Sequence, residues 1–536
     1  MRDFKVGIEA QKELMKALNE IAEAVGSTMG PGGRSFGYDK WGTDMRLSSS
    51  FSKDGLTVLR ALDFPDAPAY QAVLQYCRQA SSHSFITSGD GTTSTIVLAN
   101  AVAKAVTNEK SKYPQYLARI LEADARAAVE EIQKEAVKTP ETVRKVALTS
   151  CNGDEELADI VIKSIGMSSA FGSILVEKNA ASSERYSINQ QDGYSNCSGY
   201  NYNSTFALSA SESAASSKTI EWENPYVALF NGALLSATQV DPIVMAWTEA
   251  CKKTASSLVI VAYDVGDEVT NKLLVLNRKL SINGVGIFVV KPRLTAEVLA
   301  GLQVMRDIAA FTGVSDDMII DGGNYTEVTP DYLGTCSKTK ISQNNTAFLG
   351  RAENHWVDKR ILQNQSIVEE ARSDFDREIT KIRNAELAEG LVLVQIGGGM
   401  LPEIQERADR FDDASKAAQS CMRAGALPGA GASYIRAAVR AGVHKALEVA
   451  FRTIYETVLF NFGSDSNPDF LPGPGNTVKV DSETMTIKEG NALEMDVLDA
   501  CETVCAVIQN GVSLGVTIAT LGGYSYRTKE NDPILQ

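Results

Sequence analysis

The sequence predicts a multi-domain protein that combines a mostly helical part with a smaller α/β part. Its 536 residues exceed what one hydrophobic core usually organises, which suggests roughly three domains. Helical apolar spacing dominates both ends of the chain, whereas short apolar runs alternate with helical patterns in the middle. Hydrophobic residues make up 44% and charged residues 22% of the chain, as in ordinary folded proteins.

Helical patterns dominate the N-terminal quarter of the chain. The clearest covers residues 8–26, where apolar residues recur at three- and four-residue steps. Residues 92–107 and 116–136 repeat this pattern, and glycine-rich, strand-like sequence separates the first helix from the second. Because the region of Pro140 breaks the pattern, the first domain segment is expected to end near residue 135.

The middle of the chain predicts a small α/β domain behind a polar boundary. Residues 190–218 are rich in Ser, Asn, Gln, Gly and Tyr, a composition that favours exposed, irregular or edge structure. Alternation of short apolar runs with helical patterns follows, and it is typical of an α/β domain. The runs are residues 226–230, 258–262 and 285–290, and the helical patterns are 239–254 and 266–280.

The last third of the chain returns to helical patterns. Residues 351–388 form long, charged helical sequence, and residues 391–396 have the pattern of a buried strand, so a second crossing between domains is expected there. Helical patterns resume at residue 403 and continue to Val458. A Pro/Gly-rich loop then precedes a final helix, predicted from about residue 496 to 519.

Composition excludes several classes of function. A formal net charge of −15 and a pI near 4.9 argue against nucleic-acid binding, because phosphate contacts need a surplus of lysine and arginine. No run reaches the ~18 consecutive apolar residues of a membrane helix, so no membrane span is expected. The N-terminus has no apolar core of signal-peptide type, which favours a cytoplasmic location.

The cysteines and histidines do not form a recognisable metal or catalytic pattern. The eight cysteines are scattered, which favours reduced thiols over a disulfide framework. Cys501 and Cys505 have helix spacing and can in principle hold a metal, but buried thiols explain them better because no further ligand lies nearby in the sequence. The three histidines share no ligand or triad spacing.

One glycine-rich segment carries chemistry. Gly89-Asp90-Gly91-Thr92-Thr93-Ser94 precedes an apolar helix, so free backbone N–H groups and the positive end of the helix dipole would face the loop. Two glycines permit close approach of a phosphate, the threonines offer hydroxyl groups, and an aspartate can hold Mg²⁺. The alternative is an ordinary helix cap made by Asp90 or Thr92.

Two further glycine turns lie upstream, Thr28–Arg34 and Ser52–Val58. Each is commonplace alone. The chain has neither a G-x-x-x-x-G-K-[ST] segment nor a strand–G-x-G-x-x-G–helix unit, so a phosphate site of the P-loop or dinucleotide type is not predicted.

In this order and at these separations, the three glycine segments resemble the group I chaperonin family, the bacterial GroEL type. Ser150–Glu155, Ser373–Glu378 and Gly425–Gly431 extend the resemblance over almost the whole chain. It implies the multi-domain α+β/α/β chaperonin fold. A mostly helical equatorial domain would comprise residues 1–134 and 425–536, a small intermediate domain 135–189 and 391–424, and an α/β apical domain 190–390.

The resemblance also implies a nucleotide site. The matched nucleotide-binding positions are Thr28, Met29, Gly30, Pro31, Lys53, Asp90, Gly91, Thr92, Thr93, Ser94, Gly429 and Asp499. Asp90 would be the Mg²⁺ ligand, with K⁺ as a further candidate ion. Without the resemblance, Asp499 has the pattern of a helix N-cap.

Two aspartates match the catalytic positions of the family. Asp413 would orient or deprotonate the attacking water, and Asp54 would lie near the γ-phosphate. Asp412 is a one-residue alternative to Asp413. A solvated helical face for Asp413 and a turn-stabilising side chain for Asp54 are the structural alternatives. Because Asp413 would depend on domain closure for its reach, hydrolysis would be coupled to movement.

The implied function is an ATP-hydrolysing chaperonin subunit that binds non-native polypeptides in a homo-oligomeric ring and assists their folding. A lid co-chaperonin is a further candidate partner. The matched substrate-binding positions are Tyr200, Met245, Leu274 and Val275, which would offer apolar surface without a sequence code. The alternative function is a nucleotide-binding ring that acts as a passive holdase or scaffold.

Several positions depart from the family pattern. Gly32 replaces a lysine, Thr248 replaces a groove leucine, Ala430 interrupts a glycine trio, and Leu401 replaces a glutamate that contacts neighbouring subunits. These changes leave the coupling between subunits and the client preference open. They indicate a divergent member, of the kind that some large bacteriophages encode, which would then act in the host cytoplasm.

Overall fold

The computed structural model divides the chain into two compact units. Unit 1 comprises Met1–Lys163 and Asp409–Gln536, and unit 2 comprises Ser164–Ala408. This division does not test whether residues 135–189 and 391–424 form a separate intermediate domain, so that assignment stays a prediction. The structure describes residues 2–41, 47–109, 113–151, 153–168, 170–179, 182–198, 220–252, 256–280, 284–292, 298–323, 325–341, 345–352, 355–371, 374–465, 467, 469–480 and 486–527.

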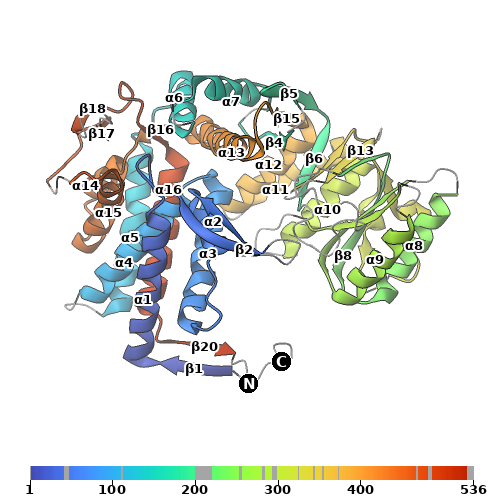
Figure 1. Cartoon of the computed structure of the whole chain (residues 1–536), viewed down its shortest axis with the longest axis horizontal. Helices are drawn as coiled ribbons and strands as arrows, with labels where there is room; N and C mark the ends of the chain where they lie inside the picture. The colour runs from blue at the N-terminus through green and yellow to red at the C-terminus, as the bar shows by residue number, and fades with distance from the viewer. Residues whose placement is uncertain are drawn as a thin grey trace. The chain divides into compact units, whose positions relative to one another are not determined.

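Unit 1 is built mainly from helices, several of which lie side by side (Figure 1). Their apolar faces share one core, which extends from Leu14 to Ala519. The chain passes between the units within α7 and again within α13. The helices are α1 (Gly7–Gly26), α2 (Gly55–Ala61), α3 (Pro68–Ser88), α4 (Thr92–Asn108), α5 (Pro114–Gln133), α6 (Pro140–Ser150), α7 (Glu155–Ser168), α13 (Leu401–Ala424), α14 (Ala432–Ala441), α15 (Lys445–Phe462) and α16 (Cys501–Thr520).

The helix α16 is the central element of this core. It packs against α3, α4 and α5. By length and composition it is the one helix in the described ranges that is able to cross a membrane, but 72% of its apolar stretch is buried inside the protein. Its apolar character is therefore explained by its place in the core of unit 1.

Four two-stranded antiparallel sheets complete unit 1. β1 (Arg2–Val6) pairs with β20 (Gly523–Arg527) at one end of the helices (Figure 1), which joins the first and the last described segments of the chain. The other pairs are β2 (Phe36–Trp41) with β3 (Leu47–Ser52), β16 (Ala426–Pro428) with β19 (Leu498–Ala500), and β17 (Asn476–Val480) with β18 (Ile487–Asn491).

Unit 2 contains an α/β layer whose strands are buried. β8 (Tyr226–Leu234) lies between β9 (Leu258–Val265) and β11 (Ile320–Asp321), β10 (Ile287–Val290) extends the sheet beyond β9, and β12 (Leu333–Thr335) pairs antiparallel with β8. The other pairings are parallel. The helices α8 (Ala237–Ala250), α9 (Asp267–Leu280) and α10 (Val298–Thr312) and two short 3₁₀ turns, η3 (Asp316–Met318) and η4 (Pro330–Tyr332), connect the strands.

Two smaller sheets and a helical hairpin complete unit 2. The antiparallel sheet has the order β6 (Gly193–Cys197), β14 (Thr346–Leu349), β13 (Lys338–Ile341) and β7 (Ile220–Glu223). The third sheet places β15 (Leu391–Ile396) between β4 (Ser173–Lys178) and β5 (Tyr186–Gln191). α11 (Trp356–Glu370) packs against α12 (Asp374–Glu389).

Most elements agree with the sequence-based expectations. The helices predicted at 8–26 and 92–107 and the strand predicted at 391–396 are confirmed. The charged helical segment 351–388 forms two helices, α11 and α12. The final helix begins at Cys501 instead of near 496, because the three residues before it pair with β16. All eight cysteines are free thiols.

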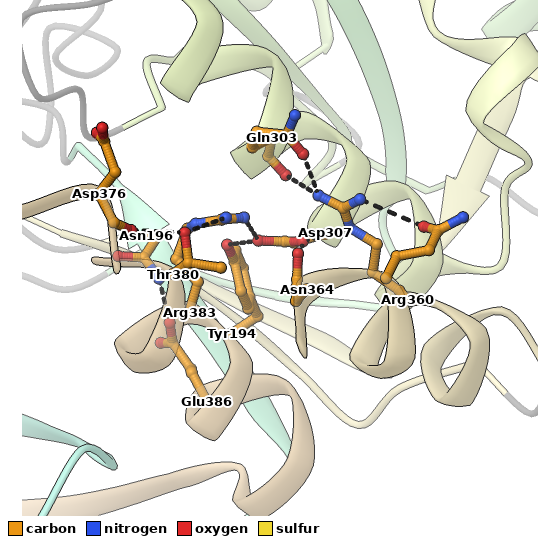
Figure 2. A network of polar contacts seen from close by, with 11 residues as sticks. Tyr194, Asn196, Gln303, Asp307, Arg360, Asn364, Asp376, Thr380, Arg383 and Glu386 are labelled. Atoms are coloured by element: carbon orange, nitrogen blue, oxygen red, sulfur yellow. Dashed lines mark hydrogen bonds and ion pairs between the residues drawn. The ribbon is translucent and has the colours of Figure 1, made fainter. Parts of the chain in front are cut away.

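A buried charge network holds the helices of unit 2 together (Figure 2). Asp307 on α10 is fully buried and lies between two arginines. Arg360 Nε on α11 donates to one carboxylate oxygen at 2.6 Å, while Arg383 on α12 and the Tyr194 hydroxyl on β6 donate to the other. Asn364 also donates to Asp307, at 3.2 Å. One carboxylate thus joins three helices and a strand.

Replacement of Asp307 by asparagine should destabilise unit 2 strongly, because it leaves two buried guanidinium groups without their shared counter-charge. We expect a loss of about 3–5 kcal/mol, measured by urea unfolding of the full chain. Tryptophan fluorescence suits this measurement, because three of the four tryptophans (Trp222, Trp247 and Trp356) belong to unit 2.

The matched control is Asp316→Asn, which removes an aspartate paired at 3.6 Å with Arg306 where both side chains are partly exposed. It should cost about 0–1 kcal/mol. Equal losses in the two variants would contradict a special role for the buried network.

Candidate functional site

The helix α4 begins without a side-chain cap. Its N-cap residue is Gly91, with φ of +81°, and no described side chain caps the helix, so the alternative in which Asp90 or Thr92 caps the helix is wrong. Asp90 Oδ1 instead accepts a hydrogen bond from the Gly91 N–H at 2.6 Å. The helix start therefore offers its dipole and first-turn N–H groups to a ligand, an arrangement that suits an anion.

Two helices approach the loop before α4 so closely that side chains are excluded from it. A Cβ atom on Gly89 would lie 2.1 Å from Cβ of Lys416, on α13. A Cβ atom on Gly91 would lie 2.6 Å from Cγ2 of Val507 and 3.0 Å from Cγ2 of Thr503, both on α16. Both glycines also have positive φ values, +75° and +81°, which favour glycine. The loop is thus held from both sides.

The two upstream turns meet this loop. Gly55 lies against Thr93, since a Cβ atom on the glycine would be 2.0 Å from the threonine Oγ1. Lys53 Nζ donates to the Pro31 carbonyl at 3.2 Å, which joins the two turns to each other. The three glycine segments are therefore joined by these contacts near the start of α4, although Thr28 and Gly89 lie 61 positions apart in the chain.

The remaining predicted nucleotide residues of these segments differ in exposure. Thr28, Met29, Gly91 and Thr92 are buried, Thr93 and Ser94 are half-buried, and Gly30, Pro31, Lys53, Asp54 and Asp90 are exposed. The Thr28 hydroxyl donates to the Val25 carbonyl at 2.8 Å and so stabilises its own turn. The exposed members are those that a ligand can reach directly.

Asp54 caps the helix α2. Its carboxylate accepts from the N–H groups of Leu56 (3.2 Å) and Thr57 (2.8 Å) and from the Thr57 hydroxyl (2.6 Å). Asp54 therefore does stabilise its own turn, as the structural alternative to a catalytic role states. The cap does not use all of the lone pairs of the carboxylate, and the exposed Asp54 is within electrostatic reach of Asp90. Its catalytic role stays a prediction.

Asp413 and Asp90 form an acidic pair across the loop. Desolvation raises the pKa of Asp413 well above its usual range, and the nearby Asp90 raises it further. Desolvation also raises the pKa of Asp90, against the hydrogen bond from the Gly91 N–H, which lowers it. Both residues are nevertheless open to solvent. Carboxylates that water reaches while protein surrounds them are typical of ligand sites.

Asp499 adds a third carboxylate. It lies in β19 opposite Leu427, so the interpretation as a helix N-cap is wrong: Ala500 is the N-cap of α16. A Cβ atom on Gly429 would lie 3.2 Å from Asp499 Oδ1, which places these two predicted residues side by side. Desolvation, with a contribution from the charge of Asp90, raises the pKa of Asp499 to about 7.

The donor set fits Mg²⁺ held jointly with phosphate. The described residues contain no group of three or more His, Cys, Asp or Glu side chains that could enclose a metal ion. Mg²⁺ in nucleotide sites commonly uses one or two carboxylates, with phosphate oxygens and water as the other ligands. Asp90 is suitably placed for this role, because it is exposed beside the anion-binding helix start.

Two residues in this region were not predicted from the sequence. Lys416 packs its side-chain stem over Gly89, and its spacing of three residues from Asp413 was an available signal. Tyr434 is buried, and burial followed by the charges of Asp499 and Asp90 raises its pKa well above the usual value. Its position in an apolar helical pattern gave no signal of this proximity.

The predicted substrate-binding positions lie in unit 2. Met245 on α8 is 71% exposed and Val275 on α9 is 54% exposed, while Leu274 is half-buried. The two helices are in contact with each other. Tyr200 lies outside the described residues. Met245 and Val275 are therefore surface residues, whereas Leu274 contributes partly to packing.

Comparison with solved structures supports the fold. Two crystal structures of the chaperonin gp146 from the bacteriophage EL 2 (Pseudomonas aeruginosa), both in the presence of ATP-BeFx, resemble this chain at 20% sequence identity. Crystal form II has a TM-score of 0.64 and the match covers 98% of this chain and 99% of that chain. Crystal form I has a TM-score of 0.59 and the match covers 97% and 98%.

The sequence comparison extends over the same region. The family profile of Cpn60_TCP1, the TCP-1/cpn60 chaperonin family, matches residues 21–521, a range that includes all three glycine segments and the aspartates at 413 and 499. The resemblance inferred from the glycine segments is confirmed, and the chain belongs to the TCP-1/cpn60 chaperonin family.

Proposed function

We propose that this chain is an ATP-hydrolysing chaperonin subunit that binds non-native polypeptides and uses ATP binding and hydrolysis to assist their folding. The observation that carries the proposal is the convergence of Asp54, Asp90 and Asp413 around the uncapped start of α4. A phosphate-binding helix start and acidic groups for a cation and a water molecule are the parts that nucleotide hydrolysis needs. Family membership supports the same activity.

The proposed site divides the work among its residues. The first turn of α4 binds phosphate oxygens through backbone N–H groups. Asp90 holds Mg²⁺, which, when bound, neutralises part of the phosphate charge. Asp413 accepts a proton from the attacking water, and its raised pKa makes it a stronger base than an ordinary carboxylate. Gly429 and Asp499 lie where the nucleoside part would bind.

The proposed client surface is on the helices α8 and α9. Met245, Val275 and the neighbouring Leu235 are all more than half exposed. Exposed apolar side chains on adjacent helices can bind any chain that has lost its own core, because both partners then bury apolar surface.

Assembly into a homo-oligomeric ring is supported by the sheets of unit 1. β1–β20 and β2–β3 are two-stranded within the described residues, and two-stranded sheets have outer edges that can accept another strand. Phe4 and Phe51 are 72% and 78% exposed on these sheets. A second copy of the chain would pair with the edges and cover the aromatic side chains.

Replacement of Asp413 by alanine should abolish most hydrolysis while nucleotide binding persists. Loss of a general base reduces turnover by about 10²–10⁴-fold, whereas removal of a negative charge near Asp90 does not oppose binding of a phosphate. Steady-state ATP turnover and calorimetric Mg²⁺·ADP binding measure the two quantities. Asp412→Ala is the control and should change turnover by less than about tenfold; the reverse ranking would transfer the role to Asp412.

Stabilisation by Mg²⁺·ADP should increase between pH 6 and pH 8. The pKa of Asp499 is raised to about 7 in the folded protein. Protonation of this carboxylate therefore stabilises the unliganded protein below pH 7, and the stabilisation is lost as the pH rises through 7. Because the charge of Asp90 contributes to the raised pKa of Asp499, a cation bound at Asp90 favours the ionised form of Asp499, so binding must displace a proton at pH 6 but not at pH 8. Thermal unfolding with and without Mg²⁺·ADP measures the effect.

The control for this pH dependence is Asp499→Asn, which has no charge to titrate. Any pH dependence that remains in the variant belongs to the nucleotide or to Asp90 and Asp413. A wild-type stabilisation that is the same at pH 6 and pH 8 would contradict the assignment of these carboxylates to a cation-dependent site.

Replacement of Met245 and Val275 together by glutamate should weaken the capture of a denatured protein by about tenfold or more, because charges replace the apolar contact surface. ATP turnover without client should stay within about twofold. Suppression of aggregation of a chemically denatured protein measures capture. The matched control is Leu362→Glu, on α11, which is 64% exposed; an equal defect in this variant would contradict a specific client surface.

A further inference from the structure

We infer that Lys416 is a positioning residue for the terminal phosphate of bound ATP. The inference rests on the proposed nucleotide function and concerns a residue outside the set predicted from the sequence. The first observation is that the side-chain stem of Lys416 packs directly over Gly89. A Cβ atom added to that glycine would lie 2.1 Å from Cβ, 2.8 Å from Cγ and 2.8 Å from Cδ of the lysine.

This contact places Lys416 beside the phosphate-binding loop. Lys416 contacts the loop at Gly89. This glycine lies one residue before Asp90 and three residues before Thr92, the first residue of α4. Its positive charge lowers the pKa of both Asp90 and Asp413, against the larger effect of desolvation. The ammonium is therefore within electrostatic reach of the cation ligand and of the proposed base.

The position of Lys416 on α13 selects the terminal phosphate. Residues three apart on a helix share a face, so Lys416 lies on the same side of α13 as Asp413. If Asp413 acts on the water that attacks the γ-phosphorus, the phosphate nearest to Lys416 is the terminal one. ADP lacks this group, so the lysine should discriminate between the two nucleotides.

The site is rich in acidic groups, so a bound phosphate needs a positively charged partner, which Lys416 can provide. Asp54, Asp90 and Asp413 all carry charge of the same sign as the phosphates. Of the basic groups near the loop, Lys53 already donates to the Pro31 carbonyl. Lys416 now pairs with the partly exposed Asp412, with Nζ 2.5 Å from Oδ2. This i, i+4 pair is solvent-accessible, so a triphosphate can compete for the ammonium.

The experiment compares Mg²⁺·ATPγS with Mg²⁺·ADP by calorimetry on the wild-type chain, Lys416→Met and Lys416→Arg. Methionine keeps the unbranched stem over Gly89 and removes the charge, whereas arginine keeps a charge. A charge-assisted phosphate contact predicts that Lys416→Met loses about tenfold or more in affinity for ATPγS and less than about threefold for ADP. Arginine should restore at least part of the difference.

Three outcomes overturn the inference. Unchanged ATPγS affinity in Lys416→Met removes the phosphate contact, and equal losses for the two nucleotides assign the lysine a general structural role. The third outcome concerns Asp412→Asn, which removes the carboxylate that now pairs with Lys416. If this variant also loses affinity for ATPγS and not for ADP, the ion pair is responsible and not a contact of the lysine with phosphate. Failure of the wild-type chain to bind either nucleotide would instead overturn the proposed function together with this inference.

Discussion

The close approach of α13 and α16 to the Gly89–Gly91 loop is the constraint on which the nucleotide site depends. Neither glycine has room for a Cβ atom, and the two contacts come from helices more than 80 residues apart in the sequence. Because α16 is buried in the core of unit 1, the loop packs directly against that core. The direction of the first N–H groups of α4 therefore follows from core packing, and does not require a ligand to organise it.

The same geometry creates an electrostatic conflict that only a charged ligand resolves. The start of α4 attracts anions, while desolvation raises the pKa of Asp90, Asp413 and Asp499 beside it, and the charge of Asp90 raises the pKa of the other two further. A phosphate alone would meet repulsion from the carboxylates, and a cation alone would meet the helix dipole. A phosphate together with a divalent cation satisfies both, and for this reason we propose a metal–nucleotide complex as the ligand of the site.

The sequence identified the segments that meet in the candidate site, but not the helices that hold them there. Gly89–Ser94 and the two upstream turns were identifiable because glycine, threonine and aspartate have strong local meaning. The contact of Lys416 with Gly89 was not, because it depends on the tertiary path of α13. The start of α16 was placed about five residues early, since the pairing of β19 with β16 is a long-range contact that local patterns do not contain. The helix α3 was missed because its serine- and glutamine-rich sequence has weak apolar periodicity.

Unit 2 combines an apolar core with a buried ionic network and with exposed apolar side chains on α8 and α9. Inside, Asp307 and two arginines join three helices and a strand, where apolar packing of similar volume is often at least as stable. Outside, Met245 and Val275 are exposed. A buried ionic network fixes one arrangement of its elements, because its hydrogen bonds fail if the helices slide.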